Sequence, residues 1–304
     1  MKPENVDLHN LPLEELIERA KVLVEALPYI NSFRGATVVV KYGGNAMIDE
    51  KLKSSVIQDI VMMELVGMNP VVIHGGGPEI SNLMNKLGIE PKFVQGQRVT
   101  DAETLEVAEM VLAGKLNGEI VNRINQTGGR AVGLSGKDAG LILAEKIGSK
   151  HKKSEKQADI GFVGEVDTIH PEIISILTDN KFIPVISPIG VGRQGQTFNI
   201  NADSVAAEIA SSLKASKLIY LTDVKGIYRD PEDESSILST IHISEVEGLI
   251  EKNVISGGMI PKVRGCKMAL SSGVNKTHVL DGRLPHSLLL ELFTDRGIGS
   301  QIIT

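Results

Sequence analysis

The sequence contains one cysteine, no tryptophan and no long apolar run. The single thiol, Cys266, excludes a disulfide within the chain and fits a reducing compartment. The apolar runs are too short to span a bilayer, and the N-terminus lacks the basic and then apolar segments of a signal peptide. We therefore expect a cytoplasmic protein that has no membrane partner.

Positive charge and metal-binding patterns are also scarce. Lys and Arg number 32 against 38 Asp and Glu, and the formal net charge of −6 argues against nucleic acid as the main partner. The seven histidines are scattered, without an HExxH motif or a His/Cys cluster, so we expect no metal site built by the protein alone. In contrast, 304 residues that are 42% hydrophobic can bury a large core, as one α/β domain or two lobes.

The most informative stretch is the run Val38–Asn45. Its three consecutive valines predict a strand buried on both faces, as in the middle of a parallel sheet. Lys41 ends this run and Gly43 and Gly44 follow, so an ammonium and bare backbone N–H groups meet at the carboxyl end of the strand. This pattern favours a phosphate site. The alternative is an ordinary glycine turn with a lysine on the surface.

A second apolar run, Pro70–Pro78, ends in a similar way. The glycines Gly75–Gly77 follow the apolar residues, and Pro78 suits the first turn of a helix, whose unpaired N–H groups form an anion site. Neither run contains a Walker A motif or the spaced GxGxxG fingerprint, so the phosphate site is of a different design. We interpret His74, beside the glycines, as a polar residue that shapes the turn.

Strands and helices alternate along most of the chain. A capping box, Thr100–Glu103, opens a long helix that is expected to run towards Ile124. Other helices are expected over 50–68, 79–87, 171–178 and 257–271, and strands over 71–74, 131–134, 182–186, 217–222 and 277–280. This alternation predicts an α/β fold, a three-layer αβα sandwich around a mostly parallel central sheet.

Residues 8–28 precede the first strand and are predicted to form an amphipathic helix. Their apolar side chains recur at i, i+3, i+4 and i+7, and Pro28 is expected to end the helix. The helix either folds back on its own domain or packs on another subunit. The charged run Lys150–Lys156 is expected to be an exposed turn. We divide the chain into an N-terminal helical segment, 1–35, a first lobe, 36–190, and a second lobe, 191–304.

Six motifs occur along the chain in an order and spacing that resemble those of the amino acid kinase family. They are VVVKYGGN, VVIHGGGPEI, GQRVTD, FNINADSVAAEIA, LIYLTDVKGIY and GGMIPKV. Within that family they resemble the branch that phosphorylates N-acetyl-L-glutamate in arginine synthesis. The resemblance covers residue 36 to the end of the chain. It implies that the first lobe binds the acceptor and forms a dimer, that the second lobe binds ATP, and that one sheet runs through both.

The resemblance implies a reaction that suits these residue types. The γ-carboxylate of N-acetylglutamate would attack the γ-phosphoryl group of ATP, with Mg²⁺ accompanying the ATP phosphates. A carboxylate is ionised at neutral pH, so no general base is needed. The family motifs assign the charges on the transferring group to Lys41 and Lys262, backbone hydrogen bonds to Gly44 and Gly76, and the positioning of both lysines to Asp203.

The same resemblance assigns the binding residues. Gly76, Gly77, Arg98 and Asn199 are expected at the acceptor, with Arg98 as a bidentate clamp on the α-carboxylate and Asn199 on the N-acetyl amide. The residues expected at the nucleotide are Lys41, Gly43, Gly44, Asp223, Gly226, Tyr228, Gly258, Met259 and Lys262.

The two ends of the chain resemble the members of the family that are inhibited by arginine. These members have the extra N-terminal helix and a tail like Glu291–Ser300. The resemblance implies feedback inhibition by L-arginine and a hexamer built as a trimer of dimers. The expected arginine contacts are Tyr29, His278, Glu291 and Gly297. Some such members also bind the PII signalling protein, although nothing in this sequence marks a PII surface.

Two other classes remain open. Relatives with this fold phosphorylate aspartate, glutamate, carbamate or UMP, but KYGGNAM differs from the KFGGTS of aspartate kinases, and GQRVTD followed by NINAD favours N-acetylglutamate. A sensor of amino acids without catalysis is the second alternative. The presence of both Lys41 and Lys262 with Asp203 argues against it.

Overall fold

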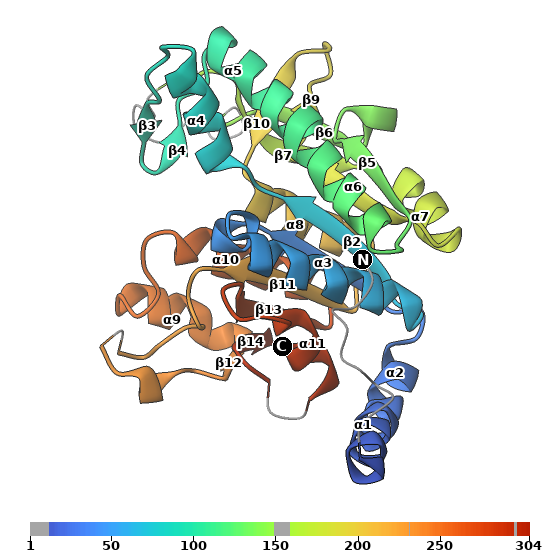
Figure 1. Cartoon of the computed structure of the whole chain (residues 1–304). Coiled ribbons are helices and arrows are strands. Elements are labelled where there is room, and N and C mark those ends of the chain that lie inside the picture. Colours follow the sequence, from blue (N-terminus) through green and yellow to red (C-terminus); the bar gives the residue numbers. More distant parts are fainter. Residues whose placement is uncertain (1–11, 149–158, 231, 295–296) are drawn as a thin grey trace.

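A computed structural model describes the chain except for residues 1–11, 149–158, 231 and 295–296 (Figure 1). In the described residues, eight strands form one sheet in the order β12-β14-β13-β11-β1-β2-β8-β5. All neighbouring pairs are parallel except β13 and β14. The strands are β1 (Thr37–Tyr42), β2 (Asn69–His74), β5 (Ala131–Ser135), β8 (Ile183–Ser187), β11 (Lys217–Thr222), β12 (Thr240–His242), β13 (Lys276–Asp281) and β14 (Ser300–Ile303).

Alternate residues of β1 enter different hydrophobic cores, which confirms the expected three layers. Val38 and Val40 pack in one core and Val39 in the other, and all three are fully buried. The first core contains residues of α3 (Glu50–Leu65), α4 (Gly77–Lys86), α5 (Ala102–Glu109), α6 (Asn117–Gln126) and α11 (Ser287–Phe293). The second contains residues of α7 (Glu172–Asp179), α8 (Ala202–Ser212), α9 (Val246–Glu251) and α10 (Met259–Ser271).

The helix expected from Ala102 to Ile124 is continuous but not α-helical throughout. Its middle, Met110–Leu116, is π-helical and joins α5 to α6. The N-cap is also one residue later than the capping box predicted, because the Asp101 carboxylate accepts from the Thr104 backbone N–H. The Thr100 hydroxyl donates instead to the carbonyl oxygen of Arg98.

A small closed barrel lies beside one end of the sheet. It consists of β6 (Ile142–Lys146), β7 (Val163–Ile169), β9 (Ile189–Val191) and β10 (Thr197–Ile200). The glycine-rich stretch at 190–196 forms the β9–β10 hairpin, in which Gly192 N–H donates to the Gln196 carbonyl. The boundary that we placed after residue 190 therefore falls inside this hairpin. The expected turn Lys150–Lys156 lies outside the described residues.

Residues 8–11 of the predicted helix 8–28 lie outside the described residues, and the rest of it belongs to two helices instead of one. Pro28 does not end the helix, because it occupies the first turn of α2 (Leu27–Phe33), where its missing N–H costs nothing. The preceding helix, α1 (Leu13–Glu25), has no buried residue, and its apolar side chains, such as Leu13 and Leu23, are exposed. In Figure 1 this helix extends away from the body of the protein. Among the described residues, no helix is long and apolar enough to cross a membrane.

Candidate active site

The ends of β1 and β2 bring the two glycine runs together. The strands pair in register, with Lys41 opposite Ile73 and Tyr42 opposite His74, and Gly75 N–H donates to the Tyr42 carbonyl at 2.9 Å. A Cβ at Gly43 would clash with the Lys41 ammonium, so this loop needs glycine for the lysine to lie against it. Lys41, Gly43, Gly44 and the segment 75–79 line a cavity of about 200 Å³, the phosphate cavity.

Asp203 lies between the two lysines. Its Oδ1 is 3.1 Å from Lys41 Nζ, and its Oδ2 is 2.7 Å from Lys262 Nζ. Asp203 is in the first turn of α8 and Lys262 in the first turn of α10, and these two helices pack together. Burial raises the pKa of the Asp203 carboxyl, but the ammonium of Lys41 and then that of Lys262 lower it further, and the net effect is a lowered pKa. The carboxylate therefore stays ionised at neutral pH.

The backbone around Asp203 is also held in place. Asn201 is the N-cap of α8, and its Oδ1 accepts from the N–H groups of Asp203 and Ser204. From β11, the hydroxyl of the buried Tyr220 donates to the Asp203 carbonyl at 3.0 Å. Taken by themselves, Lys41, Lys262 and Asp203 carry one net positive charge, which suits an anion whose own charge changes during a reaction, while the carboxylates of Glu79 and Asp223 lie nearby.

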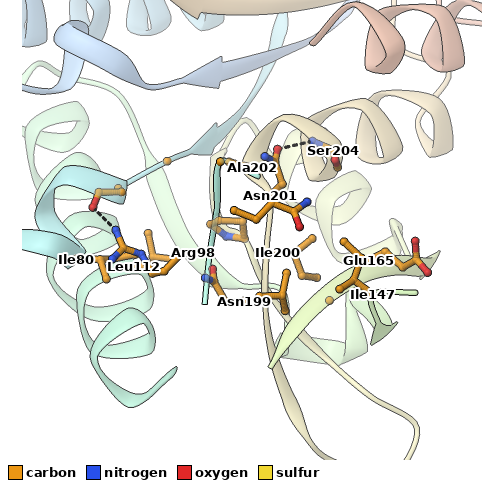
Figure 2. A pocket seen from close by; sticks show the side chains of 18 of the residues that line it. Ile80, Arg98, Leu112, Ile147, Glu165, Asn199, Ile200, Asn201, Ala202 and Ser204 are labelled. Carbon is orange, nitrogen blue, oxygen red and sulfur yellow. Dashed lines mark hydrogen bonds between the residues drawn. The ribbon is translucent and has the colours of Figure 1, made fainter. Parts of the chain in front are cut away.

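A second cavity, of about 380 Å³, contains the residues expected at the acceptor. Figure 2 shows Arg98 beside Ile80 and Leu112, with Asn199 and Ile200 next to it and Ile147 and Glu165 beyond them. We call this the acceptor cavity. Its walls come from α4, the π-helical segment, the β3–β4 hairpin (Phe93–Val94 and Gln97–Arg98) and the small barrel.

Arg98 is held without a carboxylate partner in the described part of the chain. Its guanidinium donates to the Gly77 carbonyl at 2.9 Å and to Ser81 Oγ at 2.7 Å, and it lies 4.8 Å from the centre of the Phe93 ring. Burial lowers its pKa, but a guanidinium remains protonated at pH 7. A 9% exposed cation with no carboxylate partner among the described residues is suited to an anionic ligand.

The acceptor cavity and the phosphate cavity share Gly75, Gly76 and Gly77. A Cβ at Gly76 would clash with the side chains of Leu112 and Leu116, so only glycine lets the π-helical segment approach this closely. A ligand in the acceptor cavity and a phosphate beside Lys41 would therefore meet at this glycine run.

The structure places the residues expected at the nucleotide in two groups. Gly44, with φ of 68°, lies so close to the Asp223 carboxylate that a Cβ would clash with it, and Asp223 follows β11, the neighbour of β1. The remaining expected residues outside the phosphate cavity belong to the second half of the chain and line neither cavity. They are Gly226, Tyr228, Gly258, Met259 and Lys262, of which Lys262 contacts Asp203.

Three of the four residues expected at arginine line a third cavity, of about 340 Å³. They are His278, Glu291 and Gly297. His278 Nδ1 is 2.8 Å from Glu291 Oε1, and its Nε2 is 3.1 Å from the ammonium of Lys217, which also lines the cavity. Tyr29 is not among the lining residues, although its helix reaches this region, since Phe33 lies under the Lys217 ammonium at 5.3 Å.

Sequence reasoning missed Lys217 and Asn201. A lysine at the start of an otherwise apolar strand was the available signal for Lys217, which is 8% exposed. Burial lowers the pKa of Lys217 to about 8. For Asn201, the signal was an Asn directly before an acidic helix start, the pattern of an N-cap.

Comparisons with known proteins agree on a family. The amino acid kinase family model matches residues 36–281. An acetylglutamate kinase of Heliobacterium modesticaldum is 56% identical over 290 residues, which are 94% of this chain and 98% of that protein.

Two solved structures of an N-acetylglutamate synthase from Neisseria gonorrhoeae are also similar. The complex with coenzyme A and N-acetyl-glutamate has a TM-score of 0.81 and 28% identity over 94% of this chain, which spans 63% of the synthase. The complex with coenzyme A and L-arginine has a TM-score of 0.77 and 27% identity over 93% of this chain and 65% of the synthase. With the match to residues 36–281 and the 56% identity, these findings show that the chain belongs to the amino acid kinase family.

Proposed function

We propose that this protein transfers the γ-phosphoryl group of ATP to the γ-carboxylate of N-acetyl-L-glutamate, a step of arginine synthesis. The observation that carries the proposal is the ionic group Lys41–Asp203–Lys262 beside a glycine run that two cavities share. A relative that is 56% identical is named acetylglutamate kinase, which favours this acceptor over aspartate, carbamate or UMP.

The acceptor cavity provides complementary groups for each part of N-acetylglutamate. Arg98, charged and without a carboxylate partner in the described part of the chain, suits the α-carboxylate. The Asn199 side chain, which donates to Thr100 Oγ1 at 3.4 Å, offers an amide to the N-acetyl group. With these two ends bound, we expect the γ-carboxylate to lie towards the glycines at 75–77, which the acceptor cavity shares with the phosphate cavity. The glycine run is therefore where the two substrates react.

The chemical step needs no proton transfer. A γ-carboxylate oxygen forms a bond to the γ-phosphorus, the bond from that phosphorus to the bridging oxygen breaks, and ADP leaves with the electron pair. Lys41 and Lys262 neutralise the charge on the transferring group, and the N–H groups of Gly44 and Gly76 donate to its oxygens. Asp203 holds both ammonium groups at the site.

The residues fit an ATP that brings its own Mg²⁺. Among the described residues, no cluster of three or more His, Cys, Asp or Glu side chains can hold a metal ion, so the phosphate oxygens would provide most of its ligands. Mg²⁺ bound in this way supplies further neutralisation of the ATP phosphates.

A coupled assay of ADP release over a panel of acceptors tests the proposal. N-acetyl-L-glutamate should support turnover well above that with L-glutamate, L-aspartate, carbamate or UMP. Faster turnover with any other acceptor would contradict the assignment. Binding of N-acetylglutamate without any ADP release would favour the amino-acid sensor.

We further propose that L-arginine inhibits the enzyme from the third cavity. Burial raises the pKa of the Glu291 carboxyl, but His278 and other neighbours lower it more, so an ionised carboxylate can bind the guanidinium. The Lys217 ammonium can bind the α-carboxylate. The similarity to a synthase described in complex with L-arginine supports this proposal.

The oligomer proposal rests on α1. Its apolar side chains Leu13, Leu16, Ile17, Leu23 and Val24 are exposed. Exchange of this helix between dimers would bury them and form a hexamer, a trimer of dimers. A PII protein is a further proposed partner, for which we assign no surface. Deletion of residues 1–28 should leave an active dimer that arginine inhibits weakly, whereas an unchanged hexamer would exclude this role of α1.

A further inference from the structure

His74 is the residue directly before the glycine run, and the step proposed above does not use it. It ends β2 and is fully buried. Its Nδ1 lies 2.9 Å from the Gly75 carbonyl oxygen, and its Nε2 lies 3.2 Å from Nδ2 of Asn117. Asn117, the first residue of α6, is also buried, so both side chains form a polar contact inside the apolar first core.

The contacts of Asn117 fix the tautomer of His74. Asn117 Nδ2 is 2.9 Å from the Val185 carbonyl oxygen, which can only accept, so the amide must turn its NH₂ group towards it. The second hydrogen of the same NH₂ group then faces His74 Nε2, which must accept. The ring proton therefore resides on Nδ1 and is donated to the Gly75 carbonyl. Burial lowers the pKa of His74 to about 4, so the ring is neutral at pH 7.

This hydrogen bond determines where Gly76 N–H points. The Gly75 carbonyl and the Gly76 N–H belong to one planar trans peptide, in which they point in opposite directions. Glycines on both sides leave the dihedral angles next to this peptide unusually free. An anchor on the carbonyl oxygen therefore fixes the N–H on the opposite side, the group assigned above to the transferring phosphoryl.

The π-helical segment, Met110–Leu116, determines where Asn117 lies. Leu112 and Leu116 of this segment contact the α-carbon side of Gly76, and Asn117 follows directly. A π-helical turn shifts the register of the residues after it, and such turns occur often at functional sites. One turn of this helix thus packs on Gly76 and also holds the ring that binds Gly75.

We propose that Asn117 and His74 are positioning residues for phosphoryl transfer, and that they orient the Gly75–Gly76 peptide so that its N–H donates to the transferring group. The proposal rests on the proposed function for the identity of that group. The Nδ1–H tautomer of His74 and its hydrogen bond to the Gly75 carbonyl do not depend on the proposed function.

The first test is independent of activity. In full-length protein labelled with ¹⁵N-histidine, the signal that disappears in His74→Asn belongs to His74. Its shifts should show the Nδ1–H tautomer between pH 6 and 8. The Nε2–H tautomer, or a charged ring in this range, would overturn the proposal even if the activity is as proposed.

The second test compares two amides at position 74. His74→Asn keeps a donor near the position of Nδ1, whereas His74→Gln places its amide near Nε2 and leaves the Gly75 carbonyl without a donor. We expect His74→Gln to lower kcat about 10- to 100-fold, the range found when a residue that orients a metal ligand is replaced, with the KM for N-acetylglutamate changed less than about threefold. His74→Asn should retain most of the wild-type kcat.

His170→Leu is the matched control. His170 Nδ1 also lies 2.9 Å from a glycine carbonyl, that of Gly140, but His170 is exposed and lines neither the acceptor nor the phosphate cavity. Its kcat should equal that of the wild type. Equal losses of kcat in His74→Asn and His74→Gln would reduce His74 to a packing role and overturn the proposal. Wild-type protein without turnover on N-acetylglutamate would instead contradict the proposed function.

Discussion

Replacing Asp203 by Asn removes one charge and almost no volume from the centre of the site. In the wild type, the Asp203 carboxylate is 3.1 Å from Lys41 Nζ and 2.7 Å from Lys262 Nζ, and its side chain is 9% exposed. An Asn can accept a hydrogen bond from one lysine, but it turns an NH₂ group towards the other. Two like charges then remain side by side without a counter-ion.

The expected cost follows from these distances. At an effective dielectric constant of about 20, unit charges at these separations attract by about 5 and about 6 kcal/mol, and desolvation of the three groups offsets most of this gain. Breaking a buried ionic group of this kind typically costs about 3 kcal/mol. We therefore expect Asp203→Asn to lower the free energy of unfolding by about 3 kcal/mol at pH 7, and to lower kcat about 100-fold or more because both ammonium groups are displaced.

The stability difference between wild type and Asp203→Asn should depend on pH. The pKa of Asp203 is lowered in the folded state, so its stabilisation is complete above about pH 4, the unfolded value, and is lost as the pH falls through the folded pKa. In urea unfolding at equal protein concentration, the difference between wild type and Asp203→Asn should therefore be largest at pH 7 and shrink below pH 4. A variant within about 0.5 kcal/mol of the wild type at pH 7, with kcat within threefold, would refute this reasoning.

Three further substitutions test the separate roles proposed for Lys262, Arg98 and Lys217. Lys262→Ala should lower kcat about 100-fold while the acceptor KM changes little, and the opposite pattern would assign Lys262 to acceptor binding. Arg98→Lys should raise the acceptor KM about tenfold with less effect on kcat, because a lysine cannot form the bidentate contact; an unchanged KM would remove Arg98 from the acceptor cavity. Arginine inhibition should weaken as the pH rises through about 8, where Lys217 loses its proton, and Lys217→Arg should flatten this profile in inhibition assays between pH 7 and 9.

The sheet could be predicted because its strands carry strong local patterns. Val38, Val39 and Val40 indicated burial on both faces, and the structure has each valine in the expected kind of core. The small barrel was less accessible to prediction. Its strands are short, and β10 pairs with β7 and β9, so tertiary pairing rather than local pattern defines it. Pro28 was wrongly expected to end a helix, because a proline can also occupy the first turn of the next one.

The site was predictable where a motif marked it. Strand ends with glycines indicated Lys41 and the 75–77 run, whereas only the family motifs connected Asp203 and Lys262 to them, since these residues are far apart in the sequence. Asn117 carried no such mark. It lies inside a long helix and directly after a π-helical turn that the residue pattern of 102–124 does not reveal.

An oxygen-isotope experiment tests the central claim most directly. N-acetyl-L-glutamate with ¹⁸O in its γ-carboxylate is incubated with ATP and the enzyme, and the acyl phosphate product is observed by ³¹P NMR before it hydrolyses. A γ-carboxylate nucleophile leaves one ¹⁸O between carbon and phosphorus, so the product signal should show an isotope shift, and an acceptor labelled in the α-carboxylate should give none. An unshifted product from the γ-labelled acceptor, or a shift from the α-labelled one, would contradict the proposed reaction.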